Sequence, residues 1–262
     1  MSADRILLVL IVLAAHYGLL VNVPHFAFAG VTAFLMTLLA LALWLRARAA
    51  GPVAAIFVLM AGYGYVAPAG LQGLPILSFL LPALVLLSLA PRWAAARASV
   101  RGWLRVGQPG SRDWFWVAAT AAVSALALLL WAKWTDSWGV GAQMVRDVPR
   151  TPVAFAVGIP IFATLNAAAE ELVYRGFVQE GARSAFPPER YGPGPFLALS
   201  AAAFAAAHYA AGFPNGAVGY VMVLGYGIML GWLREKTRGL LAPWVAHVTA
   251  DTVIAAILLG GT

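Results

Sequence analysis

The chain has 262 residues, of which 62% are hydrophobic and only 10% are charged. Soluble domains have about 45–50% apolar and about 25% charged residues, so this composition excludes an ordinary soluble domain and a disordered chain. The absence of cysteine excludes a disulfide framework, a thiolate nucleophile and a cysteine metal site. The sequence therefore predicts a polytopic membrane protein.

The net charge of +7 comes from short basic clusters between apolar segments. This distribution is typical of topology signals and of contact with anionic lipid headgroups. It lacks the basic stripe with interleaved aromatic residues that nucleic-acid-binding proteins carry. The expected partner is the lipid bilayer and not nucleic acid. Arginine accounts for 15 of the 17 basic residues, and this bias points to a GC-rich bacterial genome and hence to a bacterial inner membrane.

A membrane-spanning helix needs about 20 predominantly apolar residues. Nine segments approach this criterion, in chain order 6–23, 26–45, 52–68, 74–90, 114–134, 152–173, 195–212, 216–233 and 239–259. The expected fold class is an all-α polytopic transmembrane helical bundle of about nine spans. Residues 1–113 are expected to form accessory membrane helices of unknown function, and residues 114–262 the helical core that carries the chemistry.

Charge asymmetry predicts the orientation of these spans. With a cytoplasmic N-terminus, the inside segments carry 14 arginines and lysines, whereas the outside segments carry three, Lys133, Arg146 and Arg150. Because cytoplasmic loops are enriched in basic residues, nine spans with the N-terminus inside and the C-terminus outside fit the sequence.

The sixth segment contains the sequence Glu170-Glu171-x-x-x-Arg175. An ionisable group inside the membrane costs about 2.5–3.5 kcal/mol on insertion scales. On an α-helix Glu171 and Arg175 lie one turn apart and are expected to form an ion pair, while Glu170 points elsewhere without a basic partner at helical spacing. An interfacial Glu/Arg network at a helix end explains Glu171 and Arg175, but it does not explain Glu170.

Two later segments carry histidines. His208 follows an alanine run, with Phe204 one turn earlier, and His247 shares a helix face with Asp251. Taken alone, His208 is explained by a hydrogen bond to a carbonyl, and the His247–Asp251 pair by a polar contact between helices. At a rise of about 1.5 Å per residue, however, Glu170, His208 and His247 fall in one layer nearer the cytoplasmic side. This coincidence favours one shared site.

Three motifs resemble those of the CPBP (ABI) intramembrane proteases, namely Glu170-Glu171-x-x-x-Arg175, Phe204-x-x-x-His208 and His247-x-x-x-Asp251. That family includes the type II CAAX prenyl endopeptidases and bacterial relatives linked to bacteriocin processing or self-immunity. The resemblance covers about residues 155–258. It implies an all-helical core with a site open towards the cytosol, and a glutamate-activated water that hydrolyses a peptide bond of a membrane-associated peptide or protein.

The resemblance also implies a role for each residue. Glu170 and His208 would activate the water, and His247 with residue 251 would face the oxyanion. Glu171, Arg175 and Phe204 are supporting residues, because they hold the helix and wall the pocket. The family pattern accepts Asn or Asp at position 251. Since an ionised Asp251 cannot donate a hydrogen bond, it is expected to orient His247 instead.

Two alternatives stay open. Glu170, His208 and His247 have the ligand types of a zinc site, although the chain has no His-Glu-x-x-His helix and no cofactor is expected. Buried Glu and His residues also serve proton relays, so a transporter, an immunity protein or a scaffold is the non-catalytic alternative. For a bacterial protease, the expected substrates are leader peptides, bacteriocin precursors or C-terminal sorting anchors. The expected approach to the site is lined by Tyr209, Tyr220 and Tyr226.

Overall fold

The computed structural model describes residues 2–20, 25–68, 75–137, 152–211 and 213–259. All regular structure in these residues is helical, which confirms the predicted all-helical class. Each of the nine predicted apolar segments corresponds to a long helix, namely α1 (Ala3–Leu20), α2 (His25–Trp44), α3 (Ala50–Val66), α4 (Pro75–Leu89), α6 (Ser111–Thr135), α7 (Pro152–Glu170), α10 (Gly194–Ala211), α11 (Gly216–Thr237) and α12 (Leu241–Leu259).

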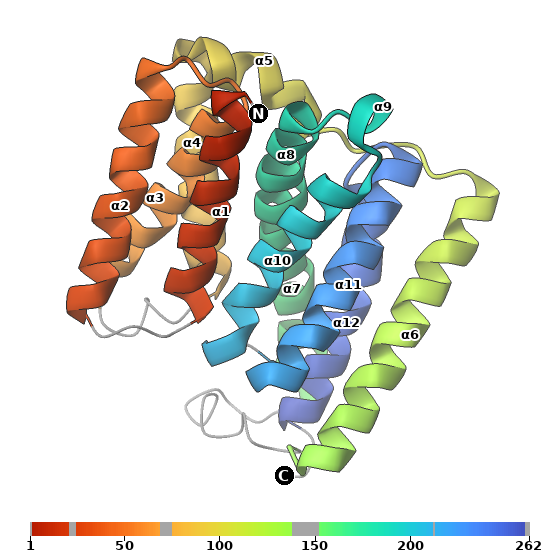
Figure 1. Cartoon of the computed structure of the whole chain (residues 1–262). Helices are drawn as coiled ribbons and strands as arrows, with labels where there is room; N and C mark the ends of the chain where they lie inside the picture. Colours follow the sequence, from red (N-terminus) through yellow and green to blue (C-terminus); the bar gives the residue numbers. More distant parts are fainter. Residues whose placement is uncertain (1, 21–24, 69–74, 138–151, 212, 260–262) are drawn as a thin grey trace.

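The remaining helical elements are short. They are the 3₁₀ turn η1 (Ala90–Arg92), α5 (Ala94–Trp103), the π-helix η2 (Glu171–Gln179), α8 (Glu180–Ala185) and α9 (Pro188–Tyr191). The segments α7, η2 and α8 follow one another without a break, so they form one long rod. The N-terminus, α5, α8 and α9 lie at the same end of the molecule (Figure 1).

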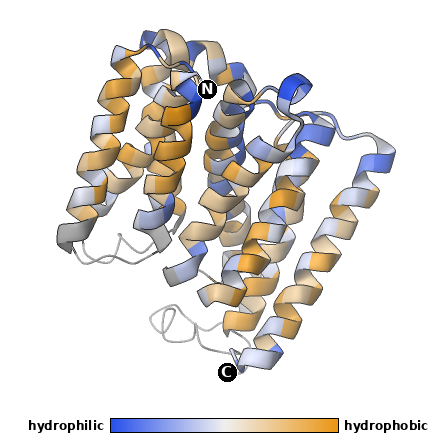
Figure 2. Cartoon of the chain, in the orientation of Figure 1, coloured by the Kyte–Doolittle hydropathy of each residue, from blue (hydrophilic) through white to orange (hydrophobic). Residues whose placement is uncertain are grey.

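The surface of the bundle fits a lipid environment. Four helical stretches of the described residues are long and apolar enough to cross a membrane, Ser111–Thr135, Phe155–Ala185, Gly216–Thr237 and Leu241–Leu258. Large apolar side chains are exposed along the helices, and hydrophilic residues gather at the end that carries α5, α8 and α9 (Figure 2). Because so large an apolar surface is not found on soluble monomers, the chain is a membrane protein. The nine-span count and the orientation remain predictions.

The rod of α7, η2 and α8 lies between two groups of helices (Figure 1). On one side α4 packs against α7, and α3 packs against η2 and α8. On the other side α10 packs against η2, and α12 packs against α7. The helix α6 is the outermost element and contacts α12 and α11. The Glu-Glu-x-x-x-Arg sequence therefore lies in the middle of the bundle.

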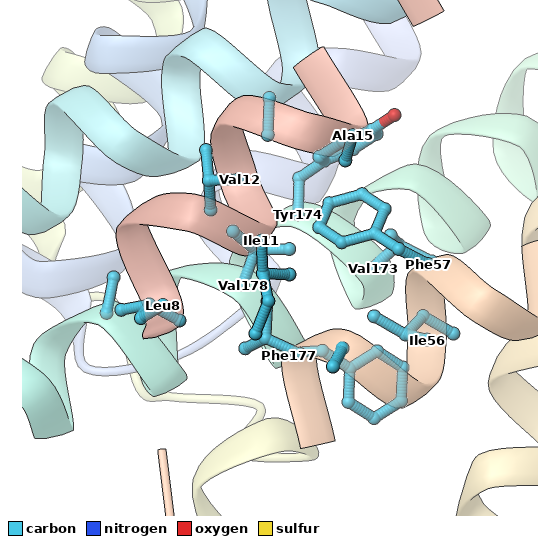
Figure 3. Close-up of a cluster of buried hydrophobic side chains, with 14 of the residues drawn as sticks. Leu8, Ile11, Val12, Ala15, Ile56, Phe57, Val173, Tyr174, Phe177 and Val178 are labelled. Atoms are coloured by element: carbon cyan, nitrogen blue, oxygen red, sulfur yellow. The ribbon is translucent and has the colours of Figure 1, made fainter. Parts of the chain in front are cut away.

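The first helices form the apolar support of η2. Fully buried side chains of α1 (Leu8, Ile11) and α3 (Ile56) meet Val173 and Phe177 of η2 in one cluster (Figure 3). Within lipid, helices associate through close packing rather than through exclusion of water. The sequence predicted no function for residues 1–113. In the structure, α1 and α3 from this region pack against η2, the segment that begins with Glu171.

The basic loop between residues 91 and 113 is a partly helical strap. Trp103 at the end of α5 is buried, and its ring centroid lies 4.7 Å from that of Phe177. The backbone N–H of Leu240 donates to the carbonyl of Arg105 at 2.8 Å, and Arg234 donates to the carbonyl of Gly102 at 3.1 Å. These contacts join the strap to both η2 and the start of α12.

The orientation is testable because the chain lacks native cysteine. Arg97 in α5 and Lys133 near the end of α6 are both exposed. With a cytoplasmic N-terminus, a membrane-impermeant maleimide is expected to label Lys133→Cys in intact spheroplasts, and Arg97→Cys only after permeabilisation. The reverse pattern would invert the topology. Labelling of both variants from outside would contradict an odd number of spans between them. Arg146 and Arg150, the other predicted outside residues, lie outside the described residues.

Candidate active site

The two glutamates lie at a change of helix type. The α-helix α7 ends at Glu170, and the wider π-helix begins at Glu171. Gly176 within this π-helix lies against the strap, since a Cβ atom there would be 3.2 Å from the carbonyl oxygen of Trp103. Long π-helices are rare, and π-type turns are frequent at functional sites. The sequence analysis assumed a continuous α-helix here and missed this change.

A buried ion pair links the first motif to the last. Arg175 and Glu171 have side chains that are 0% and 1% exposed, and their closest charged atoms are 3.1 Å apart, as the sequence predicted. The same carboxylate oxygen of Glu171 lies 2.8 Å from Nδ1 of His247. Arg175 also donates to the carbonyl of Gly227 at 3.3 Å, and its guanidinium lies 4.4 Å from the centre of the Phe204 ring. One guanidinium therefore contacts η2, α10 and α11.

Glu170 belongs to the same cluster through two neighbours. Its Oε2 lies 3.6 Å from Nε2 of His247, and that nitrogen is also 3.6 Å from Oδ1 of Asp251. The side-chain amide of Asn166, one turn before Glu170, donates to Glu170 Oε1 and to Asp251 Oδ2, both at 3.1 Å. Among the described residues, Glu170 Oε2 has no hydrogen-bond partner. One carboxylate oxygen of Glu170 thus accepts a hydrogen bond from Asn166, and the other can accept a hydrogen bond or a proton from a further group.

His208 lies beside this cluster rather than within it. Its Nδ1 is 3.0 Å from the carbonyl oxygen of Phe204, and because a carbonyl only accepts, Nδ1 carries the proton of that hydrogen bond. The Phe204 ring contacts both imidazoles, with centroid distances of 4.8 Å to His208 and 5.6 Å to His247. Among the described contacts, no hydrogen bond or ion pair joins His208 directly to Glu170.

A cavity of about 210 Å³ lies between α6, α10, α11 and α12. Polar side chains on its wall come from three of the motif residues and from α6 and α11, namely Ser124, His208, Tyr226, His247 and Asp251. The remaining walls are mostly aliphatic, with Val123, Leu128, Met222, Met229 and Ile254 among them. Such a mixture, apolar walls with a few polar groups, is typical of ligand-binding pockets.

The structure thus brings five of the predicted residues into one buried cluster, Glu170, Glu171, Arg175, His247 and Asp251. Phe204 contacts this cluster, and His208 shares the cavity with His247 and Asp251. Of the three predicted tyrosines, Tyr226 lines the cavity, whereas Tyr209 and Tyr220 do not. The sequence analysis missed Asn166. An amide one turn before Glu170, inside an otherwise apolar span, was the signal that pointed to it.

The donor set does not fit the zinc alternative. Within the described ranges, no group of three or more His, Cys, Asp or Glu side chains is arranged to hold a metal ion. Both ring nitrogens of His247 face carboxylates, Glu171 at 2.8 Å and Glu170 and Asp251 at 3.6 Å.

The buried pair predicts a strong effect on stability. Arg175→Leu leaves the Glu171 charge buried beside an apolar side chain and is expected to lower the free energy of unfolding by about 3–5 kcal/mol. The double variant Glu171→Leu/Arg175→Leu removes both charges, so it is expected to recover part of this loss. Arg183→Leu is the matched control, because Arg183 pairs with Glu235 but is 39% exposed and is expected to lose at most about 1 kcal/mol.

Thermal melting of the purified variants in detergent measures these differences. Equal melting temperatures for Arg175→Leu and the wild type would contradict the energetic role of the pair. A double variant that melts no higher than the single one would show that the paired charge is not the cause.

Comparison with known proteins agrees with the motifs. Residues 152–253 match the family described as type II CAAX prenyl endopeptidase Rce1-like. No match is found among curated proteins or among solved structures. The matched residues run from the start of α7 into α12 and include every predicted motif residue. The resemblance inferred from the sequence is thereby confirmed for residues 152–253, which are similar to the CAAX-protease-like membrane proteases.

Proposed function

We propose that the protein is a glutamate-type intramembrane endopeptidase that hydrolyses a peptide bond of a membrane-associated protein or peptide. The observation that carries the proposal is the environment of Glu170. One oxygen of this carboxylate is held by Asn166, and the other is buried, lacks a hydrogen-bond partner among the described residues and lies 3.6 Å from Nε2 of His247. His247 in turn lines the cavity. Such a carboxylate is suited to take a proton from water at the cavity edge.

The substrate peptide would enter the cavity between α6 and α11. The apolar walls favour a hydrophobic segment, which agrees with a substrate that reaches the site from the membrane. His208 would help to place the water, since its Nδ1 is engaged by Phe204 and its other ring nitrogen is left for the cavity. Leader peptides, bacteriocin precursors and C-terminal sorting anchors all have segments of this kind.

In the proposed reaction, Glu170 removes a proton from the water as the water oxygen bonds to the carbonyl carbon. The tetrahedral intermediate then collapses, the C–N bond breaks, and Glu170 returns the proton to the leaving amine. Glu171 and Arg175 do not exchange protons in this scheme. Their ion pair holds the His247 ring and the start of η2, so that the base and the imidazole keep their relative position.

The main test is Glu170→Gln, which keeps the shape and removes the base. Loss of general-base catalysis is expected to lower the rate by about 10²–10⁴-fold. Quantitative proteomics of membranes from cells with wild-type or Glu170→Gln protein is expected to reveal a precursor that accumulates only in the variant. An internally quenched peptide that spans its cleavage site then measures the rate with purified protein in proteoliposomes.

Glu189→Gln is the matched control, because Glu189 is exposed in α9 and contributes nothing to the cluster. It is expected to process the precursor at the wild-type rate. An unchanged membrane proteome with folded Glu170→Gln protein would sink the protease proposal and favour the transporter, immunity or scaffold alternative.

A chelator separates the glutamate mechanism from the zinc alternative. Since the described residues offer no suitable ligand group, incubation of the purified protein with EDTA or phenanthroline is expected to leave the rate of peptide cleavage unchanged. Complete loss of activity that added zinc restores would overturn the metal-free mechanism.

A further inference from the structure

Hydrolysis of a peptide bond needs a hydrogen-bond donor at the carbonyl oxygen, where negative charge develops. In the family pattern residue 251 contributes to this task, but Asp251 in its ionised form has no proton to donate. Its Oδ2 accepts from Asn166, and its Oδ1 lies 3.6 Å from Nε2 of His247. The donor must come from another group on the cavity wall.

His247 is poorly placed to act alone. Its Nδ1 lies 2.8 Å from Glu171, and its Nε2 lies between Glu170 and Asp251 at 3.6 Å from each. Its Nδ1 is thus engaged by Glu171, whereas Nε2 faces two carboxylates at a distance too long for a hydrogen bond, so His247 has at most one N–H for a substrate oxygen. Ser124, near the Tyr226 hydroxyl, donates its own proton to the carbonyl of Ala121 at 2.9 Å. Ser124 therefore offers no unengaged donor, and a second donor beside Nε2 of His247 has to come from another side chain.

Tyr226 offers such a donor. Its side chain lines the cavity from α11, and its ring meets the His247 ring edge-on at a centroid distance of 5.7 Å. Its hydroxyl oxygen is buried and lies near the Ser124 hydroxyl, but it has no partner of ordinary hydrogen-bond geometry among the described residues. A buried hydroxyl without a partner is unfavourable, and a substrate oxygen in the cavity would relieve this cost.

The backbone next to Tyr226 is held on both sides. The carbonyl of Gly227 accepts from Arg175 at 3.3 Å. A Cβ atom on Gly227 would lie 3.0 Å from Cβ of Ala201, so α11 and α10 are in close contact at this level. The backbone beside Tyr226 is thus held by the same arginine that pairs with Glu171, the residue next to the proposed base.

We propose that Tyr226 is a further catalytic residue whose hydroxyl donates a hydrogen bond to the carbonyl oxygen of the cleaved bond. The inference rests on the proposed function. As the water oxygen bonds to the carbonyl carbon, Glu170 takes one water proton and the carbonyl π pair moves to the oxygen. Tyr226 stabilises this oxyanion without transferring its proton. When the C–N bond breaks, the pair returns to re-form the carbonyl, and Glu170 gives its proton to the amine.

Tyr226→Phe tests the proposal because it removes one oxygen atom and keeps the ring. With the quenched peptide defined above, kcat is expected to fall by about 10²–10³-fold, as for loss of one oxyanion donor, while KM stays within about twofold. Tyr174→Phe is the matched control. Its hydroxyl is also buried without a partner among the described residues, but it does not line the cavity. This control is expected to keep the wild-type kcat.

A binding measurement distinguishes catalysis from structure. A phosphinic peptide, with tetrahedral phosphorus in place of the cleaved carbonyl, mimics the intermediate. Tyr226→Phe is expected to lower the affinity for this peptide by the same factor as kcat/KM. On the inactive Glu170→Gln background, Tyr226→Phe is expected to leave the affinity for the uncleaved amide peptide unchanged.

The outcomes separate the two proposals. If Glu170→Gln is inactive and Tyr226→Phe keeps the wild-type kcat, the role of Tyr226 is overturned and the protease proposal stands. Equal losses in Tyr226→Phe and Tyr174→Phe also overturn that role. If Glu170→Gln stays active, the protease proposal itself is wrong.

A second variant applies if Tyr226→Phe fails to fold. Replacement of Tyr226 by 3-fluorotyrosine keeps the hydroxyl and makes it a stronger hydrogen-bond donor. A higher kcat would support the role of Tyr226, and an unchanged kcat would overturn it.

Discussion

The site depends on the compensation of charge in the interior of a membrane protein. Three carboxylates, Glu170, Glu171 and Asp251, lie buried around the imidazole of His247, and the guanidinium of Arg175 forms an ion pair with one of them, Glu171. None of these groups is tolerable alone in a low-dielectric environment. Arg175 makes the arrangement possible, since it pairs with Glu171 and at the same time contacts the aromatic ring and the backbone of two other helices. Arg175 therefore contacts a charged partner, Glu171, and also uncharged groups of α10 and α11.

The rest of the bundle holds this cluster in place. Buried side chains of α1 and α3 pack behind η2, and the strap that contains Trp103 closes one end. At that end Arg234 bridges Glu180 at 2.8 Å and the carbonyl of Gly102 at 3.1 Å, which joins α8, α11 and the strap. Long π-helices are rare, and in this bundle η2 is packed against α3, α5 and α10. The N-terminal helices thus pack behind the segment that carries the glutamates, although they lie outside the family match.

Helix positions were predictable from the sequence because hydropathy alone marks apolar segments. The segment 114–134 corresponds to Ser111–Thr135, and 216–233 to Gly216–Thr237. The motif spacing likewise predicted the Glu171–Arg175 pair. The helix type was not predictable, because no feature of the sequence of residues 171–179 distinguishes a π-helix from an α-helix. Asn166 was missed for a different reason. Its partner Asp251 is 85 residues away, and no local rule brings the two together.

One wall of the cavity lies outside the residues that match the family. The carboxylates and histidines all come from the matched segment, 152–253, whereas α6 lies before it and contributes Val123, Ser124 and Leu128 to the cavity. On the proposed function, the reacting groups are those that the family shares, and the substrate also touches a helix that the family match does not include. If the proposed function holds, changes in α6 are expected to alter which peptide is accepted and to leave the charge cluster intact, because α6 contacts α11 and α12 but contributes no charged group to the cluster. The proposed machinery of hydrolysis and one proposed substrate-selecting surface would then lie on different helices.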